Sequence, residues 1–185
     1  MSDEKNEPEP ALSLKDGSVP GPEPWLRGTH DEVPAVQRAV VHALELAGED
    51  IEKWCGGLSD AELNATPHGL APVAFHLRHV ARSIDRLLTY AEGRELDAAQ
   101  VAALKSEMEA GASHAEVFDE VKQALESGCF RVRAVRAGGL EAFRGVGKKQ
   151  LPTSVGGLLV HVADHTQRHV GQAVITAKVL LSERK

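Results

Sequence analysis

The chain has 185 residues, a formal net charge of -6 and a pI near 5.8. This length is enough for one domain with a sizeable hydrophobic core. An acidic chain lacks the basic surface that binding to a nucleic-acid backbone requires, so we expect no nucleic-acid partner.

The two cysteines, Cys55 and Cys129, stand far apart, which argues against a disulfide framework and against a cysteine-rich zinc motif. No apolar run approaches the roughly 20 residues that a membrane-spanning helix needs. The first residues are acidic and rich in proline, unlike a signal peptide. These features predict a cytoplasmic protein with no membrane partner.

The first part of the chain differs in composition from the rest. Residues 1–28 combine Pro, Glu, Asp, Ser and Gly with few large apolar side chains, so burial there could not offset the entropy lost on ordering. We expect a disordered acidic tail over residues 1–28 and one folded domain over residues 29–185. Thr29 and Glu32 have the spacing of a helix capping box, which predicts that the first helix begins there.

Apolar residues recur at helical spacing in four long segments. A shorter segment, beginning at Asp97 with Gln100 as its cap partner, predicts one additional helix that ends near Ala110. No segment alternates as a strand would, and residues 58–72 are expected to form a plain connection. The long segments begin near Thr29, Val73, Ser113 and Thr153, and end near Trp54, Gly93, Val135 and Leu180.

The predicted class is therefore all-α: a four-helix bundle with one short extra helix. The two long connections, residues 93–112 and 138–152, permit crossovers in place of a plain up-down-up-down order.

Three histidines, four residues apart, stand in the last long helix, within "HVADHTQRHVGQ" at residues 161–172. They share a helical face with apolar residues, so His161, His165 and His169 are predicted to point inward. Two histidines four residues apart on a helix can bind one ion. Two histidines eight residues apart lie about 12 Å from each other along the helix axis, which is too far to share an ion. At most two of these histidines therefore belong to one site.

A further ligand is available in the second helix, where "FHLRHVARSID" contains His76 and His79. Spacing alone does not choose between them. An unligated cluster of buried imidazoles would need several hydrogen-bond partners and would repel itself when protonated. We therefore predict a divalent metal site, with a hydrogen-bonded core cluster as the alternative. The other four histidines are interpreted as structural or surface groups: His30, His42, His68 and His114.

Two segments, "HVARSIDRLL" and "HVADHTQRHVGQ", resemble the DinB/YfiT-like superfamily of four-helix-bundle proteins, often described as metal-dependent hydrolases. The resemblance implies that the metal ligands are His79, His165 and His169. His76, His161 and Gln172 are then candidates to orient a ligand, a water or a substrate, with plain packing or a surface hydrogen bond as the alternative. Many relatives have an acidic residue soon after the second-helix histidine, where this chain has Arg82.

Three neutral imidazoles leave a coordination position open on a divalent metal ion, as in catalytic zinc sites, and Zn or Ni is the expected metal. Such an ion lowers the pKa of a bound water, which makes hydrolysis chemically available. However, "HTQRH" lacks the glutamate of an HExxH motif, and the sequence places no carboxylate as a general base. The catalytic residues therefore stay unassigned.

An open metal position also suits a low-molecular-weight thiol, which the ion would deprotonate for attack on an electrophile. By resemblance we expect a metal-dependent enzyme that acts on a small-molecule substrate, either by thiol-dependent S-transfer or by hydrolysis. The alternative is a non-catalytic bundle that binds a metal or a small ligand. Bundles with an exposed apolar edge often pair, so a homodimer is among the expected assemblies.

Overall fold

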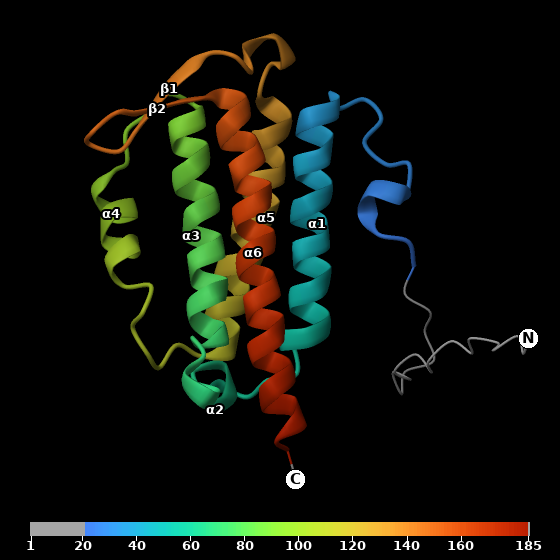
Figure 1. The fold of residues 1–185 in the computed structure, drawn as a ribbon, viewed down its shortest axis with the longest axis vertical. Helices are drawn as coiled ribbons and strands as arrows, with labels where there is room; N and C mark the ends of the chain where they lie inside the picture. The colour runs from blue at the N-terminus through green and yellow to red at the C-terminus, as the bar shows by residue number, and fades with distance from the viewer. Residues whose placement is uncertain (1–20, 185) are drawn as a thin grey trace, which may run out of the picture.

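The computed structural model of the chain describes residues 21–184 (Figure 1). Within this range the predicted all-α bundle is confirmed. Its long helices are α1 (Ala35–Cys55), α3 (Val73–Ala91), α5 (His114–Ala134) and α6 (Val155–Ser182). The shorter elements are α2 (Asp60–Leu63), α4 (Ala98–Lys105), the strands β1 (Phe143–Val146) and β2 (Leu151–Ser154), and the 3-10 turns η1 (Pro24–Leu26), η2 (Pro67–Gly69) and η3 (Ala137–Gly139).

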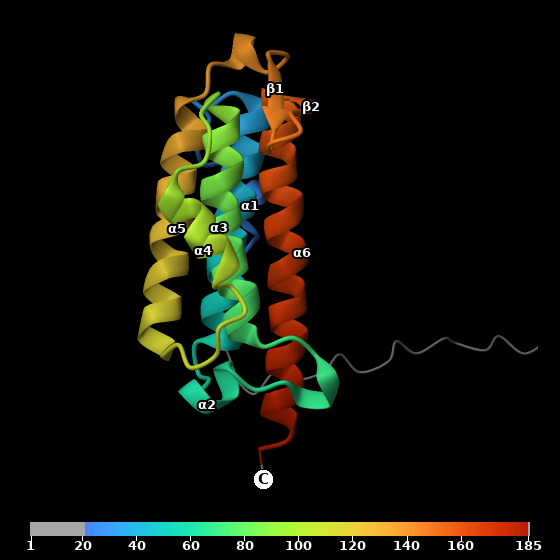
Figure 2. The same ribbon diagram turned by 90° about the vertical axis from the view of Figure 1, so that its left-hand side faces the viewer.

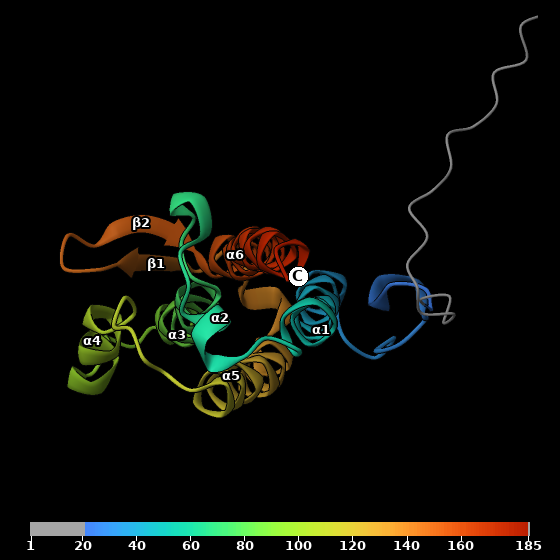
Figure 3. The ribbon, with the colours of Figure 1, turned by 90° about the horizontal axis from the view of Figure 1, so that it is seen from below.

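The four long helices form a ring in which consecutive helices are not always neighbours. In Figure 3, α5 and α6 face each other across the bundle, and each packs against both α1 and α3. In Figure 1, α1 and α6 descend while α3 and α5 rise, so the connection between α3 and α5 must return along the bundle. This crossover contains α4, which lies outside α3 (Figure 2). Of the two long connections, residues 93–112 therefore make the crossover.

The core consists of the inward faces of the four long helices. Leu44 from α1, Leu77 and Ile84 from α3 and Leu159 from α6 are almost completely buried. Helices α3 and α6 are neighbours, so polar side chains that lie in the interface between them are brought close together. His76 and His79 of α3 and His165 and His169 of α6 lie in this interface. Within residues 21–184, none of the helices combines the length and the apolar character needed to cross a bilayer.

The first helix begins later than the sequence predicted. Pro34 is the N-cap of α1, with extended backbone angles, and the Thr29–Glu32 capping box is not formed. The reason is local: the residue before a proline is disfavoured in the helical region, so the helix cannot run through Val33. Of the expected tail, residues 1–20 lie outside the described residues, whereas residues 21–28 carry η1 and contact α1.

A short β-hairpin and a short helix were not predicted. Strands β1 and β2 pair as an antiparallel hairpin, and their four-residue segments are too short and too exposed to show an alternating pattern. Helix α2 lies in the expected plain connection, where Ser59 and Glu62 form a capping box. The predicted capping box of Asp97 with Gln100 is confirmed, although α4 ends at Lys105 rather than near Ala110.

Candidate metal centre

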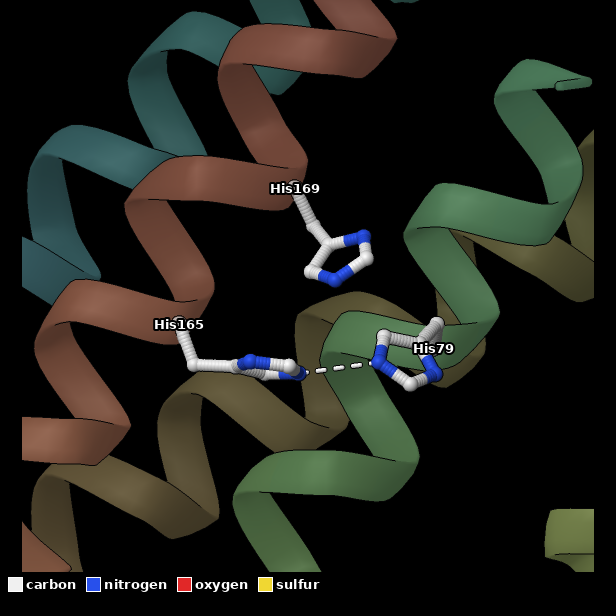
Figure 4. A group of neighbouring side chains, drawn as sticks. All are labelled: His79, His165 and His169. Atoms are coloured by element: carbon white, nitrogen blue, oxygen red, sulfur yellow. Dashed lines mark hydrogen bonds between the residues drawn. The ribbon is translucent and has the colours of Figure 1, made fainter.

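Three histidines from two neighbouring helices converge inside the bundle (Figure 4). His79 comes from α3, and His165 and His169 lie one helical turn apart on α6. One ring nitrogen from each lies within 4.8 Å of the others, and Nε2 of His79 is 2.8 Å from Nε2 of His165. All three side chains are partly buried. The structure thus brings together the three ligands that the resemblance implies.

Glu107 fixes the protonation pattern of His79. This carboxylate, in the turn that follows α4, lies with Oε2 2.7 Å from Nδ1 of His79. An ionised carboxylate only accepts hydrogen bonds, so Nδ1 of His79 carries the proton. The other nitrogen, Nε2, faces His165 and is the nitrogen through which His79 could bind a metal ion. A metal-ligating histidine needs this tautomer, and a carboxylate behind it is the usual partner.

The Glu107 carboxylate is itself held in place. Its side chain is 7% exposed, and its second oxygen, Oε1, accepts a hydrogen bond from Nη1 of Arg86 at 2.6 Å. Arg86 also donates to Ser83 Oγ at 3.0 Å, and that hydroxyl is 3.4 Å from Nε2 of His79. A buried carboxylate is tolerated when it is paired and hydrogen-bonded, as here. Both oxygens of Glu107 are therefore engaged, Oε2 by His79 and Oε1 by Arg86.

His76 contacts the cluster from its other side. It is 5% exposed, and its Nδ1 lies 3.1 Å from Nδ1 of His169. One of these two nitrogens must donate to the other, and the His169 nitrogen that remains, Nε2, faces His79 and His165 in Figure 4. His76 is therefore placed to orient His169, one of the roles considered from the sequence.

The other two candidates lie farther from the cluster. His161 is exposed. The centroid of its ring lies 5.2 Å from that of His165, with the two rings tilted by 46°, and its Nδ1 lies 3.7 Å from a carboxylate oxygen of Asp164. The prediction that His161 points inward is wrong, because α6 turns this position toward solvent one helical turn before His165. Gln172 is also exposed, and it lines a cavity of about 440 Å³ that also reaches His76.

The cluster favours neutral imidazoles. Burial, reinforced by the neighbouring imidazoles, lowers the pKa of His76 and of His165 to about 4. Burial, together with His79 and Arg168, also lowers the pKa of His169. The lowered pKa values favour the unprotonated form of these rings, which is the form that binds a metal ion.

The donor set fits a divalent metal ion. It consists of three imidazoles, one held by a buried carboxylate and one by a further histidine, with no lysine or arginine in hydrogen-bonding contact with the three ligand rings among the described residues. Imidazole suits zinc, nickel, copper and iron(II). Three protein ligands also leave a coordination position for another molecule.

Glu107 is the functional residue that the sequence did not reveal. It lies 28 positions after His79 in a turn with no recognisable motif, so nothing in the sequence pairs the two. Arg82, which replaces the acidic residue of many relatives, forms no hydrogen bond with the three histidines. It donates hydrogen bonds to the carboxylate of Glu120 on α5 and to the carbonyl oxygen of Ala103 in α4. The carboxylate at this site therefore comes from a different segment.

Comparisons with known proteins agree with this architecture. The DinB superfamily model matches residues 43–173. The solved structure of a conserved protein from Enterococcus faecalis superimposes with a TM-score of 0.67 at 18% identity, covering 81% of this chain and 99% of that one. At this identity the likeness concerns the fold alone. No curated protein matches the chain. Because the family match spans more than half of the residues and includes all three clustered histidines, the chain belongs to the DinB superfamily.

Proposed function

We propose that the protein is a metal-dependent enzyme that transfers a low-molecular-weight thiol to a small electrophile, with His79, His165 and His169 as the metal ligands. The observation that carries this proposal is the convergence of their three nitrogens within 4.8 Å, with Glu107 holding His79 in the ligating tautomer. When bound, a divalent ion such as Zn or Ni would lower the pKa of a thiol placed at its open position.

The residues around the site favour a thiol over a water as the nucleophile. Both oxygens of Glu107 are engaged, by His79 and by Arg86, and no other carboxylate contacts the three histidines within residues 21–184. A thiol has a pKa near 8.5 and needs little further help to ionise, whereas a water usually requires more activation. The lack of a free carboxylate base therefore matters less for a thiol.

The thiol must come from outside the chain. Burial raises the pKa of Cys55 to about 12 and that of Cys129 to about 11, so neither supplies a thiolate at neutral pH. In the proposed reaction the sulfur of the external thiolate forms a bond to carbon of the electrophile. The leaving group departs with the bonding electron pair, and the thiol proton passes to solvent.

Hydrolysis is the second candidate, and the all-imidazole donor set favours it. Three histidines are also the ligands of a zinc hydroxide centre that works at neutral pH. In that reaction a water takes the place of the thiol, and the small-molecule substrate is an ester or an amide. The non-catalytic alternative, a bundle that only binds a metal or a small ligand, uses the same histidines without turnover.

The metal content of the purified protein tests the first step. Protein without a polyhistidine tag is dialysed against a weak chelator and its metals are counted by mass spectrometry. We expect His161→Ala to hold as much Zn or Ni as the wild type, and His165→Ala to hold about one ion per chain less. The exposed His161 is the matched control because it lies on the same helix, one turn away. Equal metal content in both variants would refute the assignment.

Activity assays then separate the candidates. The metal-loaded protein is incubated with thiols plus alkyl or acyl electrophiles, and separately with ester and amide panels. Turnover with the first set that disappears in His79→Ala supports S-transfer, and turnover with the second supports hydrolysis. Tight ligand binding without turnover in either set supports the non-catalytic alternative. The cytoplasmic location and the homodimer stay predictions, which fractionation and analytical ultracentrifugation test.

A further inference from the structure

A second group of metal-binding side chains lies on α1, away from α3 and the histidine cluster. His42 and Glu45 are three residues apart and so share one face of the helix. His30 lies in the preceding turn. One ligand atom from each of these three residues lies within 4.8 Å of the others. The sequence alone gave these two histidines only a structural interpretation.

The turn that carries His30 is fixed against α1. His30 itself has a positive φ of 62°, which non-glycine residues rarely adopt, and its carbonyl oxygen accepts a hydrogen bond from Val33 N at 2.9 Å. Nε2 of His30 lies 2.6 Å from Oε1 of Glu45. Nε2 of His42 lies 3.2 Å from the carbonyl oxygen of Thr29, which orients this buried ring. The three groups are therefore positioned before any ion binds.

A cavity of about 970 Å³ lies beside this group, between α1 and α5. The residues that line it include His30 and Glu45, together with the apolar side chains of Leu44, Phe118 and Leu125. Five acidic and three basic side chains line it. This excess of negative charge favours the approach of a cation.

We propose that His30, His42 and Glu45 form a second divalent-metal site that opens toward the cavity between α1 and α5. Two histidines and one carboxylate are a ligand set that zinc and iron(II) accept, and three protein ligands leave positions for a further molecule. The apolar side chains that line the cavity would accommodate the hydrocarbon part of that molecule. This site is independent of the function proposed for His79, His165 and His169.

Arg133 from α5 is the charged group that opposes a cation here. Its Nη2 lies 3.2 and 3.3 Å from the two ring nitrogens of His30 and 4.0 Å from Oε1 of Glu45. The side chain is 37% exposed, so it can move into solvent when an ion binds. Repulsion by Arg133 then weakens the affinity of the site. Removing its charge should strengthen metal binding, which is a consequence that a purely structural pairing of His30 with Glu45 does not predict.

The test uses full-length untagged protein in which the first cluster has been removed by His79→Ala and His165→Ala. Circular dichroism confirms that each protein is folded, and Zn²⁺ alone is titrated into it by calorimetry. We expect one Zn²⁺ per chain in this background. Adding Glu45→Gln should weaken binding by about tenfold or more, because a charged ligand is lost. Adding Arg133→Gln should strengthen it.

Glu49→Gln is the matched control. Glu49 lies one helical turn beyond Glu45 and lines the same cavity, but it is paired with Arg27 rather than with the histidines. This variant keeps all three proposed ligands, so it should change the affinity for Zn²⁺ far less than Glu45→Gln does. The proposal is overturned if the background protein binds no Zn²⁺, or if Glu45→Gln and Glu49→Gln have equal effects. Neither result bears on the first cluster, because two of its three ligands, His79 and His165, are already absent from the background protein.

Discussion

Glu107 accepts a hydrogen bond of 2.7 Å from Nδ1 of His79, and it does so from a turn outside the four long helices. The contact makes the position of a bundle histidine depend on the crossover segment that follows α4. It also means that the electrostatics of the candidate metal centre extend beyond α3 and α6. The guanidinium of Arg86 balances the charge of Glu107, and the partly buried ring of His79 donates a hydrogen bond to it.

We therefore expect Glu107→Gln to reduce metal affinity by roughly 10-fold to 100-fold, the range typical for the loss of a carboxylate that supports a ligating histidine. The amide can still accept from His79, but it carries no charge to strengthen the imidazole as a ligand. Competition with a chromophoric chelator measures the change. Glu109→Gln alters the same charge on an exposed residue of the same segment and should have no effect. Equal affinities in the two variants would contradict this role for Glu107.

A smaller effect is expected for His76. Its only hydrogen-bond contact in the cluster is with His169, so His76→Gln should lower metal affinity several-fold but less than His165→Ala does. The exposed Gln172 lines the same small cavity and provides the comparison: Gln172→Ala should bind metal like the wild type. The same chelator competition measures both variants, with thermal melts as a check on folding. A loss of affinity in Gln172→Ala as large as that in His76→Gln would show that His76 has no special role.

The parts of the fold that the sequence predicted depend on local patterns. The long helices follow from apolar residues at helical spacing, and the capping box of Asp97 with Gln100 involves residues only three positions apart. The pattern at Thr29 is the same, yet it forms no cap, because Pro34 prevents the preceding residue from being helical. The capping-box spacing of Thr29 and Glu32 was thus misleading, because Pro34, which is also visible in the sequence, prevents a helix from starting there.

The candidate site was predictable only in part, for a different reason. Helical spacing together with the family resemblance pointed to His79, His165 and His169, because helices can be placed side by side from their apolar faces. The role of Glu107 depends on where an irregular turn packs after the chain has crossed the bundle. The turn at His30 is similar, since its contact with Glu45 joins positions 15 residues apart through a backbone conformation that no motif signals.

The lowered pKa values predict how pH affects the stability of the metal-free protein. Burial lowers the pKa of His76 and of His165 to about 4 in the folded state, against an ordinary value near 6.5. Between these pH values the unfolded chain binds more protons than the folded one. The free energy of unfolding is therefore highest above pH 6.5 and falls as the pH decreases toward 4, by at most about 1.4 kcal/mol per pH unit for each histidine.

Urea denaturation in the presence of a chelator, at a series of pH values from 7 to 4, measures this dependence. His165→Asn should flatten the curve, because one group that gains a proton on unfolding is absent. His68→Asn is the control, since His68 is exposed and lies outside the cluster, with its Nε2 beside a carboxylate oxygen of Glu183. A free energy of unfolding that stays constant or rises as the pH falls through this window would show that the cluster is not destabilised by protonation.

The last prediction concerns Gly128, which lies in the middle of α5 although glycine is unfavourable within a helix. A Cβ atom at this position would lie 2.8 Å from Cγ2 of Ile84 and 3.2 Å from Cδ1 of Leu44, both of them buried core side chains. The absence of a side chain thus lets α5 approach α3 and α1 closely. Gly128→Ala should therefore destabilise the protein by about 1–3 kcal/mol through overpacking, despite the better helix propensity of alanine.

Gly171→Ala isolates the effect of helix propensity from that of packing. Gly171 is exposed on α6, and a Cβ there would meet nothing within 4 Å, so alanine should stabilise the protein by up to about 1 kcal/mol. Urea unfolding of the two variants then gives changes of opposite sign for the same chemical substitution in two long helices. A stabilising Gly128→Ala would mean that Ile84 and Leu44 can move aside at little cost, and that the contact of α5 with α3 and α1 does not require glycine.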